Sequence, residues 1–286
     1  MRIVDIIKSE KPSLSFEVFP PKTDDKYELV LNAVSEIAKL SPSYMSVTYG
    51  AGGGTGTYTA QIARELNELG VTSLAHLTCI SSTKSEIRDR VTTLKDLGIK
   101  NILALRGDIP NGFDRSKIDF NYAYELIDEI KKHGDFCVGG ACYPESHPES
   151  SSAQMDLYHL KNKVEHGCDF LTTQMFFDNT VFYTFIEKIR KEGIDVPVIP
   201  GLMPVTSVSM LDRIVYLSGN SLPAKFMQMV DKYSSDPASF REAGIEYATK
   251  QAQEIYKNGF NAVHIYSMNK PNVAKQIQYN LSDVIK

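Results

Sequence analysis

The chain alternates between short apolar runs and longer amphipathic runs, and this alternation limits its possible folds more than any other feature. About eight such pairs occur in 286 residues. Strands that alternate with helices in this way are typical of parallel sheets. The apolar runs predict strands at 14–19, 44–49, 73–78, 101–105, 136–143, 170–174, 196–200 and 262–266. The amphipathic runs predict helices at 25–39, 58–69, 84–97, 122–133, 153–166, 181–191, 208–217 and 237–258.

Eight strand–helix pairs in a chain of this length fit a closed (β/α)8 TIM barrel with extra helices, formed by residues 1–286 as a single domain. An open, doubly wound sheet has the same local pattern. Open sheets that bind dinucleotides carry Gly-x-Gly-x-x-Gly after the first strand, whereas Pro20 and Pro21 follow it here. The α/β barrel is therefore the preferred fold.

The composition indicates a protein that acts on small molecules. The formal net charge is -4, and no basic run with interleaved aromatic residues appears, so nothing indicates a nucleic-acid partner. No segment approaches the ~20 apolar residues of a membrane helix, and residues 1–11 lack the apolar core of a signal peptide. We therefore expect a cytoplasmic protein without a membrane partner.

The four cysteines are expected to be reduced thiols, because they lack the spacing of zinc ligands and are too few for a disulfide framework. They are Cys79, Cys137, Cys142 and Cys168. The sequence therefore predicts no metal site.

Glu17 is the most unusual residue of the first predicted strand. The strand is apolar around it and ends at Pro20 and Pro21, which cannot donate hydrogen bonds to a sheet. A carboxylate in such a strand costs free energy unless it is paired, protonated or used in chemistry. Considered alone, an edge-strand glutamate that points into water is the simpler interpretation.

Polar residues also follow other predicted strands, at the rim where a barrel builds its site from βα loops. Each has a structural explanation alone: His76 as a core histidine, or Arg106 and Asp108 as a salt bridge. Six strand ends that all carry polar groups at one rim favour a site there. The residues are Glu17, Thr48, Tyr49, His76, Arg106, Gly107, Asp108, Tyr143, Glu145, His147, Thr173 and Gln174.

Two further segments are candidate binding elements. Residues 50–56 (GAGGGTG) lack the lysine and the spacing of a phosphate-binding P-loop, so we interpret them as a flexible active-site loop. Asp156, His159, Asn162 and Lys163 share one helix face, where Lys163 could meet a pyrophosphate and Asp156 could meet ribose hydroxyls. A solvated helix face with an ordinary ion pair explains the same spacing equally well.

Several sequence blocks in series resemble the methylenetetrahydrofolate reductase family. Their order and spacing match across nearly the whole chain, which makes the set far more specific than any one block. The blocks are FEVFPPK (16–22), VTYGA (47–51), HLTC (76–79), LALRGD (103–108), YPESHPE (143–149), TQMFFD (173–178), PGLMP (200–204) and HIYSMNK (264–270).

The resemblance implies a TIM-barrel flavoprotein that binds FAD without a Rossmann domain and reduces 5,10-methylenetetrahydrofolate to 5-methyltetrahydrofolate. Glu17 would be the general acid that opens the five-membered ring of the folate, giving an iminium that accepts hydride from reduced flavin. A carboxyl buried beside apolar side chains favours its neutral form, which suits an acid near neutral pH. Asp108 would stabilise the developing folate cation, and Gln174 would hydrogen-bond the pterin.

The same resemblance implies the residues that contact FAD, and Thr48 among them would help to position nicotinamide or flavin. They are Thr48, Tyr49, Ala51, His76, Arg106, Gly107, Asp108, Ala123, Tyr143, His147, Asp156, His159, Asn162 and Lys163. Two positions depart from the family. Lys270 stands where an arginine often faces the glutamate tail of the folate, and lysine lacks the bidentate fork of arginine. Met210 replaces a glutamine, so its helix is expected to pack rather than bind substrate.

The sequence leaves the electron donor and the assembly open. NADH or NADPH could reduce the flavin directly, and some relatives work with an electron-transfer partner subunit. We expect folate and nicotinamide as ligands, a homo-oligomer, and no appended regulatory region. Two other functions remain open: a barrel hydrolase with Glu17 and Glu145 as paired carboxylates, and a non-catalytic or partner-dependent barrel subunit of a folate-processing complex.

Overall fold

The computed structural model describes residues 1–49, 56–109, 118–211, 214 and 221–285. Its strands form one parallel sheet of nine strands in the order β7-β6-β5-β4-β3-β2-β1-β9-β8. Strands and helices alternate along the chain, as the hydrophobic pattern predicts. The strands are β1 (Ser13–Val18), β2 (Met45–Val47), β3 (Ser73–Thr78), β4 (Asn101–Leu105), β5 (Cys137–Cys142), β6 (Phe170–Thr173), β7 (Val198–Ile199), β8 (Gly201–Leu202) and β9 (Ala262–Ile265).

The sheet curves into a nearly closed barrel. Its two end strands, β7 and β8, follow one another in the sequence and therefore lie close together in space. Only Pro200 separates β7 from β8, yet β7 pairs with β6 whereas β8 pairs with β9. Proline has no N–H to donate, so the strand predicted at 196–200 ends there, and a further short strand beyond the predicted range bonds to the opposite neighbour. The predicted TIM-barrel fold is confirmed, with its seventh strand in two pieces.

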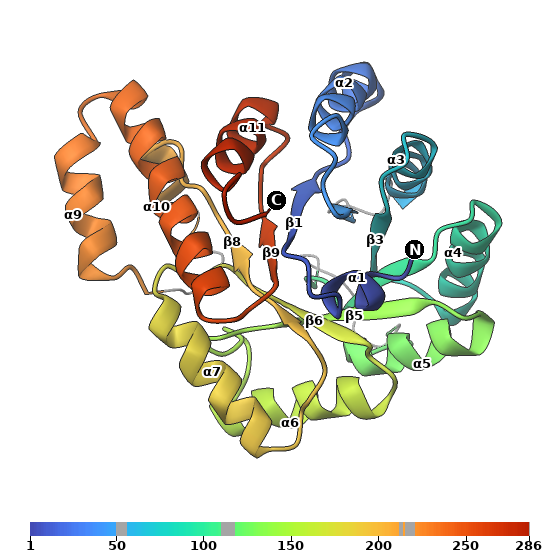
Figure 1. The fold of residues 1–286 in the computed structure, drawn as a ribbon. Coiled ribbons are helices and arrows are strands. Elements are labelled where there is room, and N and C mark those ends of the chain that lie inside the picture. The colour runs from blue at the N-terminus through green and yellow to red at the C-terminus, as the bar shows by residue number, and fades with distance from the viewer. Residues whose placement is uncertain (50–55, 110–117, 212–213, 215–220, 286) are drawn as a thin grey trace.

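Helices surround the sheet as an outer layer (Figure 1). They are α1 (Ile3–Ile7), the 3₁₀ turn η1 (Asp24–Lys26), α2 (Tyr27–Ala38), α3 (Gly56–Glu68), α4 (Lys84–Asp96), α5 (Ala123–His133), α6 (Ala153–Glu165), α7 (Asn179–Lys191), α9 (Ala224–Tyr233), α10 (Pro237–Lys257) and α11 (Pro271–Asn280). The sequence analysis missed α1, α9 and α11, and α11 is the helix that follows the last strand. Of the helix predicted at 208–217, residues 209–211 are helical and most of the remainder lies outside the described residues.

The first helix closes one end of the barrel (Figure 1). Ile3 and Val4 of α1 are buried in an apolar cluster with side chains from six of the strands, including Phe170. The amide of Ile3 donates to Asn101 Oδ1 at 2.9 Å. This cluster fills the barrel at the N-terminal ends of the strands, which leaves the opposite end of the barrel to a ligand.

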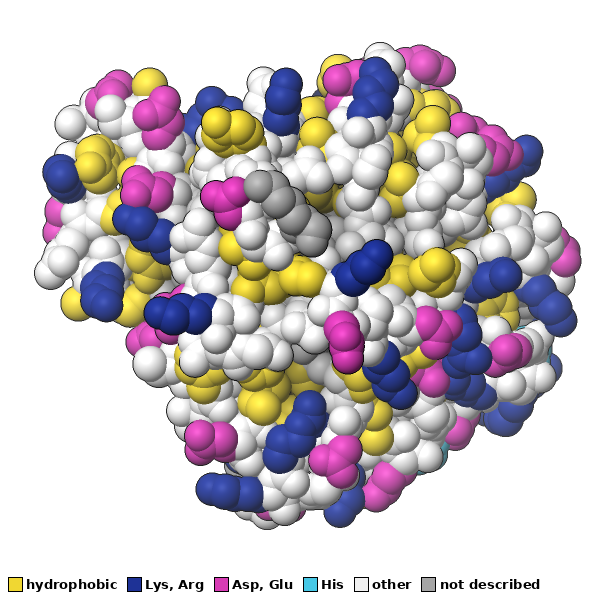
Figure 2. Space-filling model, viewed as in Figure 1, with side chains coloured by type: hydrophobic (Ala, Val, Ile, Leu, Met, Phe, Trp, Pro, Cys, Tyr) yellow, Lys and Arg dark blue, Asp and Glu magenta, His cyan; other side chains and the backbone are white. Residues whose placement is uncertain are grey.

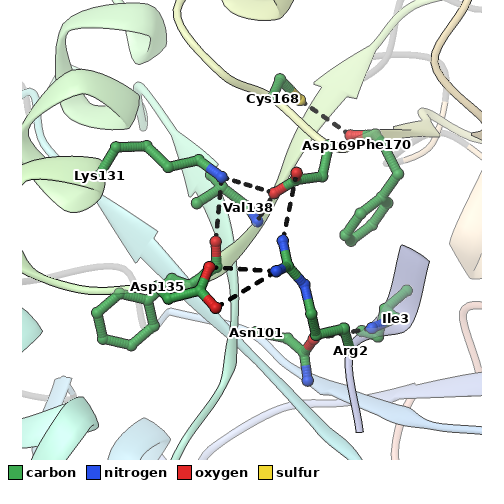
Figure 3. Close-up of polar contacts among 10 residues, drawn as sticks. Arg2, Ile3, Asn101, Lys131, Asp135, Val138, Cys168, Asp169 and Phe170 are labelled. Atoms are coloured by element: carbon green, nitrogen blue, oxygen red, sulfur yellow. Dashed lines mark hydrogen bonds and ion pairs between the residues drawn. The ribbon is translucent and has the colours of Figure 1, made fainter. Parts of the chain in front are cut away.

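Ionic contacts of Arg2, the residue before α1, hold this helix against the barrel (Figure 3). Arg2 lies 3.1 Å from Asp135 and 3.6 Å from Asp169. Asp169 also accepts from the amide of Val138 at 2.7 Å and from Lys131 Nζ at 2.8 Å. The carboxylate of Asp169 therefore joins α1, α5 and the start of β5.

The surface mixes charges of both signs. On the face shown in Figure 2, acidic and basic side chains are interspersed among small apolar areas. No helix in the described part of the chain is both long enough and apolar enough to span a membrane. The four cysteines are buried and unpaired.

Candidate active site

A cavity of about 1140 Å³ lies at the C-terminal ends of the strands. Ligand pockets usually have volumes of ~300–1,000 Å³, so this one has room for a large cofactor together with a substrate. Residues from many parts of the chain converge on it because parallel strands end at the same rim. The predicted site residues that line it are Glu17, Thr48, Tyr49, His76, Arg106, Gly107, Asp108, Ala123, Tyr143, His147, Asp156, His159, Lys163 and Gln174.

Three predicted site residues are not among this lining. Ala51 lies outside the described residues, as do residues 50–55 as a whole. Asn162 donates from its side chain to the carbonyl of Tyr158 at 2.7 Å, along its own helix. Lys270 borders a separate cavity of about 390 Å³ and donates to Thr206 Oγ1 at 2.7 Å.

The structure also keeps Glu145 apart from the cavity lining. Glu145 Oε2 accepts from the amide of Ser221 at 3.0 Å and from its hydroxyl at 2.5 Å, and so joins two surface segments. The pairing of Glu17 with Glu145 that a hydrolase requires is therefore not formed at the cavity. Within the described ranges, no cluster of His, Cys, Asp and Glu could hold a metal ion.

Glu17 lies on β1, in register with Ser46 of β2, and its side chain faces the barrel interior. The residue is only 7% exposed. Burial raises the pKa of the Glu17 carboxyl to about 8, and the hydrogen bond from Ser46 Oγ, at 3.4 Å, opposes this rise. Loss of water disfavours the carboxylate more than one long hydrogen bond can offset. The carboxyl therefore keeps its proton at neutral pH.

His76 of β3 is the nearest basic group, with Nε2 at 3.6 Å from Glu17 Oε2. Burial lowers the pKa of His76 to about 3. Both side chains are therefore neutral at pH 7, and the pair is not an ion pair. His76 Nε2 is buried and has no hydrogen-bond partner in the described part of the chain, so it remains available to a ligand.

Two cations border the opposite part of the same cavity. Arg106 follows β4 and pairs with Glu149 at 2.5 Å. Lys163 of α6 donates to the carbonyl of Ala141 at 2.7 Å, and burial lowers the pKa of its ammonium group. Two cations beside one cavity suit a diphosphate group, which accepts charge-assisted hydrogen bonds from both.

A flat aromatic surface lies beside these cations. The ring of His159 stacks on that of Tyr122, with centroids 4.3 Å apart and 22° between the planes. His159 Nδ1 is buried and lacks a hydrogen-bond partner among the described residues. Stacked rings with a free polar atom can receive a planar heterocycle.

Gly107 lets the backbone line the cavity at the end of β4. Its φ is +86°, in the region that favours glycine, and an added Cβ would lie 3.0 Å from Thr78 Cβ. A larger residue here would be strained and would push against the neighbouring strand end.

Four polar residues of the barrel interior near Glu17 were not predicted as site residues: Ser15, Ser46, His264 and Tyr266. His264 of β9 lies between two serines, with Nδ1 at 2.7 Å from Ser15 Oγ and Nε2 at 3.1 Å from Ser46 Oγ. Tyr266 donates its hydroxyl to the carbonyl of Thr173 at 2.5 Å. His264 and Tyr266 line the cavity. The period-two run of Ser13, Ser15 and Glu17 in a buried strand was the signal that could have revealed this polar interior.

Comparison with known proteins agrees with the earlier resemblance. Residues 2–282 match the family described as methylenetetrahydrofolate reductase. The 5,10-methylenetetrahydrofolate reductase of Escherichia coli is 33% identical over 270 residues, which cover 94% of this chain and 90% of that protein. Methylenetetrahydrofolate reductase (NADH) 1 of Arabidopsis thaliana is 33% identical over 300 residues, covering 98% of this chain but 51% of that protein.

The fold also recurs in a more distant solved structure. An uncharacterized protein from Clostridium thermocellum, described as binding two copies of 5-methyl-5,6,7,8-tetrahydrofolic acid, aligns with a TM-score of 0.66 and 16% identity. The alignment covers 98% of this chain and 99% of that one, and at this identity it supports the fold alone. The chain thus spans about half of the plant relative and nine-tenths of the bacterial one, and it belongs to the methylenetetrahydrofolate reductase family.

Proposed function

We propose that this protein reduces 5,10-methylenetetrahydrofolate to 5-methyltetrahydrofolate with bound FAD, and that NADH or NADPH supplies the electrons. The observation that carries the proposal is Glu17, a buried acid with a pKa raised to about 8 at the wall of the large cavity. The family assignment supplies the class of substrate. The Arabidopsis relative is named for NADH, which favours NADH here.

The residues of the cavity fit FAD. Arg106 and Lys163 would hold its diphosphate, and the stacked rings of Tyr122 and His159 would receive a planar ring. The unpaired buried atoms His76 Nε2 and His159 Nδ1 are polar contacts that such a ligand can satisfy. Bound FAD would supply the hydride that the methylene carbon of the folate receives. Ala51 and Asn162 remain proposed contacts.

Glu17 would act as the general acid. Its O–H bond breaks as the proton moves to the folate nitrogen that leaves the methylene carbon, which opens the five-membered ring. Asp108, at the same cavity, would stabilise the positive charge that develops on the folate. Gln174, whose Oε1 accepts from the amide of Met175 at 2.9 Å, would hydrogen-bond the pterin from a fixed position.

The two half-reactions separate this function from the alternatives. The protein reconstituted with FAD should be yellow, should bleach anaerobically with NADH or NADPH, and should recover its colour with methylenetetrahydrofolate. Stopped-flow absorbance measures both steps, and the faster bleaching identifies the electron donor. A protein that cannot take up FAD would refute the proposal.

Glu17→Gln should abolish reoxidation by the folate while flavin reduction survives. Glu145→Gln is the matched control, because Glu145 lies outside the cavity lining, and both steps should persist in it. Loss of both steps in Glu17→Gln would mean that Glu17 has another role. Unchanged turnover in that variant would instead favour a non-catalytic subunit.

A further inference from the structure

We propose that Ser46 and His264 are positioning residues for Glu17, linked in a buried hydrogen-bonded chain whose direction reverses when Glu17 gives up its proton. This inference rests on the proposed role of Glu17 as a general acid.

The chain of contacts runs through the barrel interior across three strands. Sheet register places Ser46 beside Glu17 and His264 beside Ser15. Ser15 Oγ lies 2.7 Å from His264 Nδ1, and His264 Nε2 lies 3.1 Å from Ser46 Oγ. Ser46 Oγ lies 3.4 Å from Glu17 Oε2, and Ser15 Oγ donates to the carbonyl of Val263 at 3.2 Å.

The side chains of this hydrogen-bonded series are buried. Ser15 and Ser46 are 0% exposed, and His264 is 2% exposed. Burial lowers the pKa of His264 to about 3, and His76 contributes to this shift. The imidazole is therefore neutral at working pH and has one donor and one acceptor nitrogen. Which nitrogen carries the proton depends on whether Ser15 and Ser46 each act as donor or acceptor toward the ring.

When Glu17 is protonated, its O–H donates to Ser46 Oγ, which reverses the direction that the same 3.4 Å contact has when Ser46 donates to the carboxylate. The hydroxyl of Ser46 then donates to His264 Nε2, so Nδ1 carries the proton and donates to Ser15 Oγ. The hydroxyl of Ser15 is left to donate to the carbonyl of Val263, as its 3.2 Å contact allows. Each donor in this arrangement faces an acceptor.

When Glu17 has lost its proton to the substrate, the carboxylate needs a donor. The hydroxyl of Ser46 turns to Glu17, His264 carries its proton on Nε2 and donates to Ser46, and the hydroxyl of Ser15 donates to Nδ1. One O–H bond of Glu17 has broken, and one N–H bond has formed on the folate. On His264 the Nδ1–H bond breaks and an Nε2–H bond forms, so the imidazole stays neutral and changes only its tautomer.

Other ionisable groups near Glu17 do not supply this donor. His76 faces it from β3 at 3.6 Å, beyond hydrogen-bonding range. Tyr44 and Tyr266 interact with Glu17 electrostatically, and its charge contributes to raising the pKa of each hydroxyl. Among the described residues, Ser46 makes the one hydrogen bond to the Glu17 carboxyl. The carboxylate therefore depends on Ser46.

The tautomer of His264 provides a direct test. In the FAD-loaded protein with ¹⁵N-labelled histidine, the His264 signals should change from the Nδ1–H to the Nε2–H pattern as pH rises through the pKa of Glu17. Glu17→Gln and Ser46→Ala should each abolish this change. An unchanged tautomer across the Glu17 titration in the wild-type protein would overturn the proposal, whether or not the variants fold.

A second readout measures the consequence for Glu17. Ser46→Ala should raise the pKa of the ¹³C-labelled Glu17 carboxyl by about 0.5–1 unit, because the carboxylate loses its donor. Reoxidation by the folate should slow about 3- to 10-fold, with flavin reduction unchanged. A wild-type pKa and rate in Ser46→Ala would also overturn the proposal.

Ser73→Ala is the matched control. Ser73 is 1% exposed on β3, and its hydroxyl has no hydrogen-bond partner in the described part of the chain. Its titration and its rates should equal those of the wild-type protein. If the wild-type protein binds FAD but is not reoxidised by the folate, the proposed function fails, while the two titrations still decide whether the chain of contacts reverses.

Discussion

Replacing Glu17 with glutamine should stabilise the folded protein, by an amount that grows with pH. The pKa of the buried carboxyl is about 8, against an ordinary value of 4.5 that applies to the unfolded chain. A carboxyl whose pKa is raised by folding does not destabilise the protein at a pH below its pKa in the unfolded chain. As pH rises from that pKa through its pKa in the folded protein, the free energy of unfolding falls. Glutamine has a similar shape and does not titrate.

The magnitude follows from the two pKa values. Each unit of difference corresponds to about 1.4 kcal/mol. The difference between about 8 and 4.5 therefore gives a stability cost of about 5 kcal/mol above pH 8, and about 3 kcal/mol at pH 7. At pH 5 the cost should be only about 1 kcal/mol, because Glu17 is still protonated in the folded protein but is about three-quarters ionised in the unfolded chain.

Urea unfolding of the FAD-free wild-type protein and Glu17→Gln at pH 5, 7 and 9 measures this dependence. Other buried groups, including His76 and His264, are present in both proteins and largely cancel in the difference. A free-energy difference for Glu17→Gln that is constant from pH 5 to 9 would refute the argument that burial keeps this carboxyl protonated.

Three further predictions concern other parts of the fold. Gly244→Ala should lower the free energy of unfolding by about 1–3 kcal/mol or more, measured in urea, because the new Cβ would lie on the carbonyl oxygen of Val205. Asp169→Asn should cost about 1–3 kcal/mol in the same assay, whereas Asp135→Asn, at an exposed carboxylate, should cost less than about 1 kcal/mol. Lys163→Met should weaken FAD binding at least about tenfold in a fluorescence titration without destabilising the FAD-free protein; unchanged affinity would exclude contact with the diphosphate.

The barrel could be predicted because each strand and most helices carry their own hydrophobic pattern. The pattern reports burial and not hydrogen-bond partners, so it could not show that the strand at Pro200 divides between two neighbours. The final helix was missed although Val273, Ala274 and Ile277 are buried on one of its faces.

The site could be predicted only as far as topology determines it. Residues just after parallel strands must meet at one rim, and most of those predicted there do line the cavity. Helical spacing shows which residues share a face of a helix but not which side chains extend into the cavity. Asn162 was therefore grouped with Lys163, although its side-chain amide donates to a carbonyl of its own helix. Ser46 and His264 were missed because the contact of Ser46 with Glu17 and the contacts of His264 with its two serines depend on strand register, which no local pattern encodes.

The pairing of β1 with β9 joins two strands that lie far apart in the sequence. Ser15 and His264 touch although they are 249 residues apart in sequence. During synthesis, β1 is made well before β9, and the edge of β1 that faces β9 has no partner until β9 is complete. Until then its carboxyl remains in contact with water and titrates like any other. The raised pKa of Glu17 therefore depends on β9 as well as on β1, and a chain shortened before β9 should carry a glutamate of ordinary acidity on an unpaired strand edge.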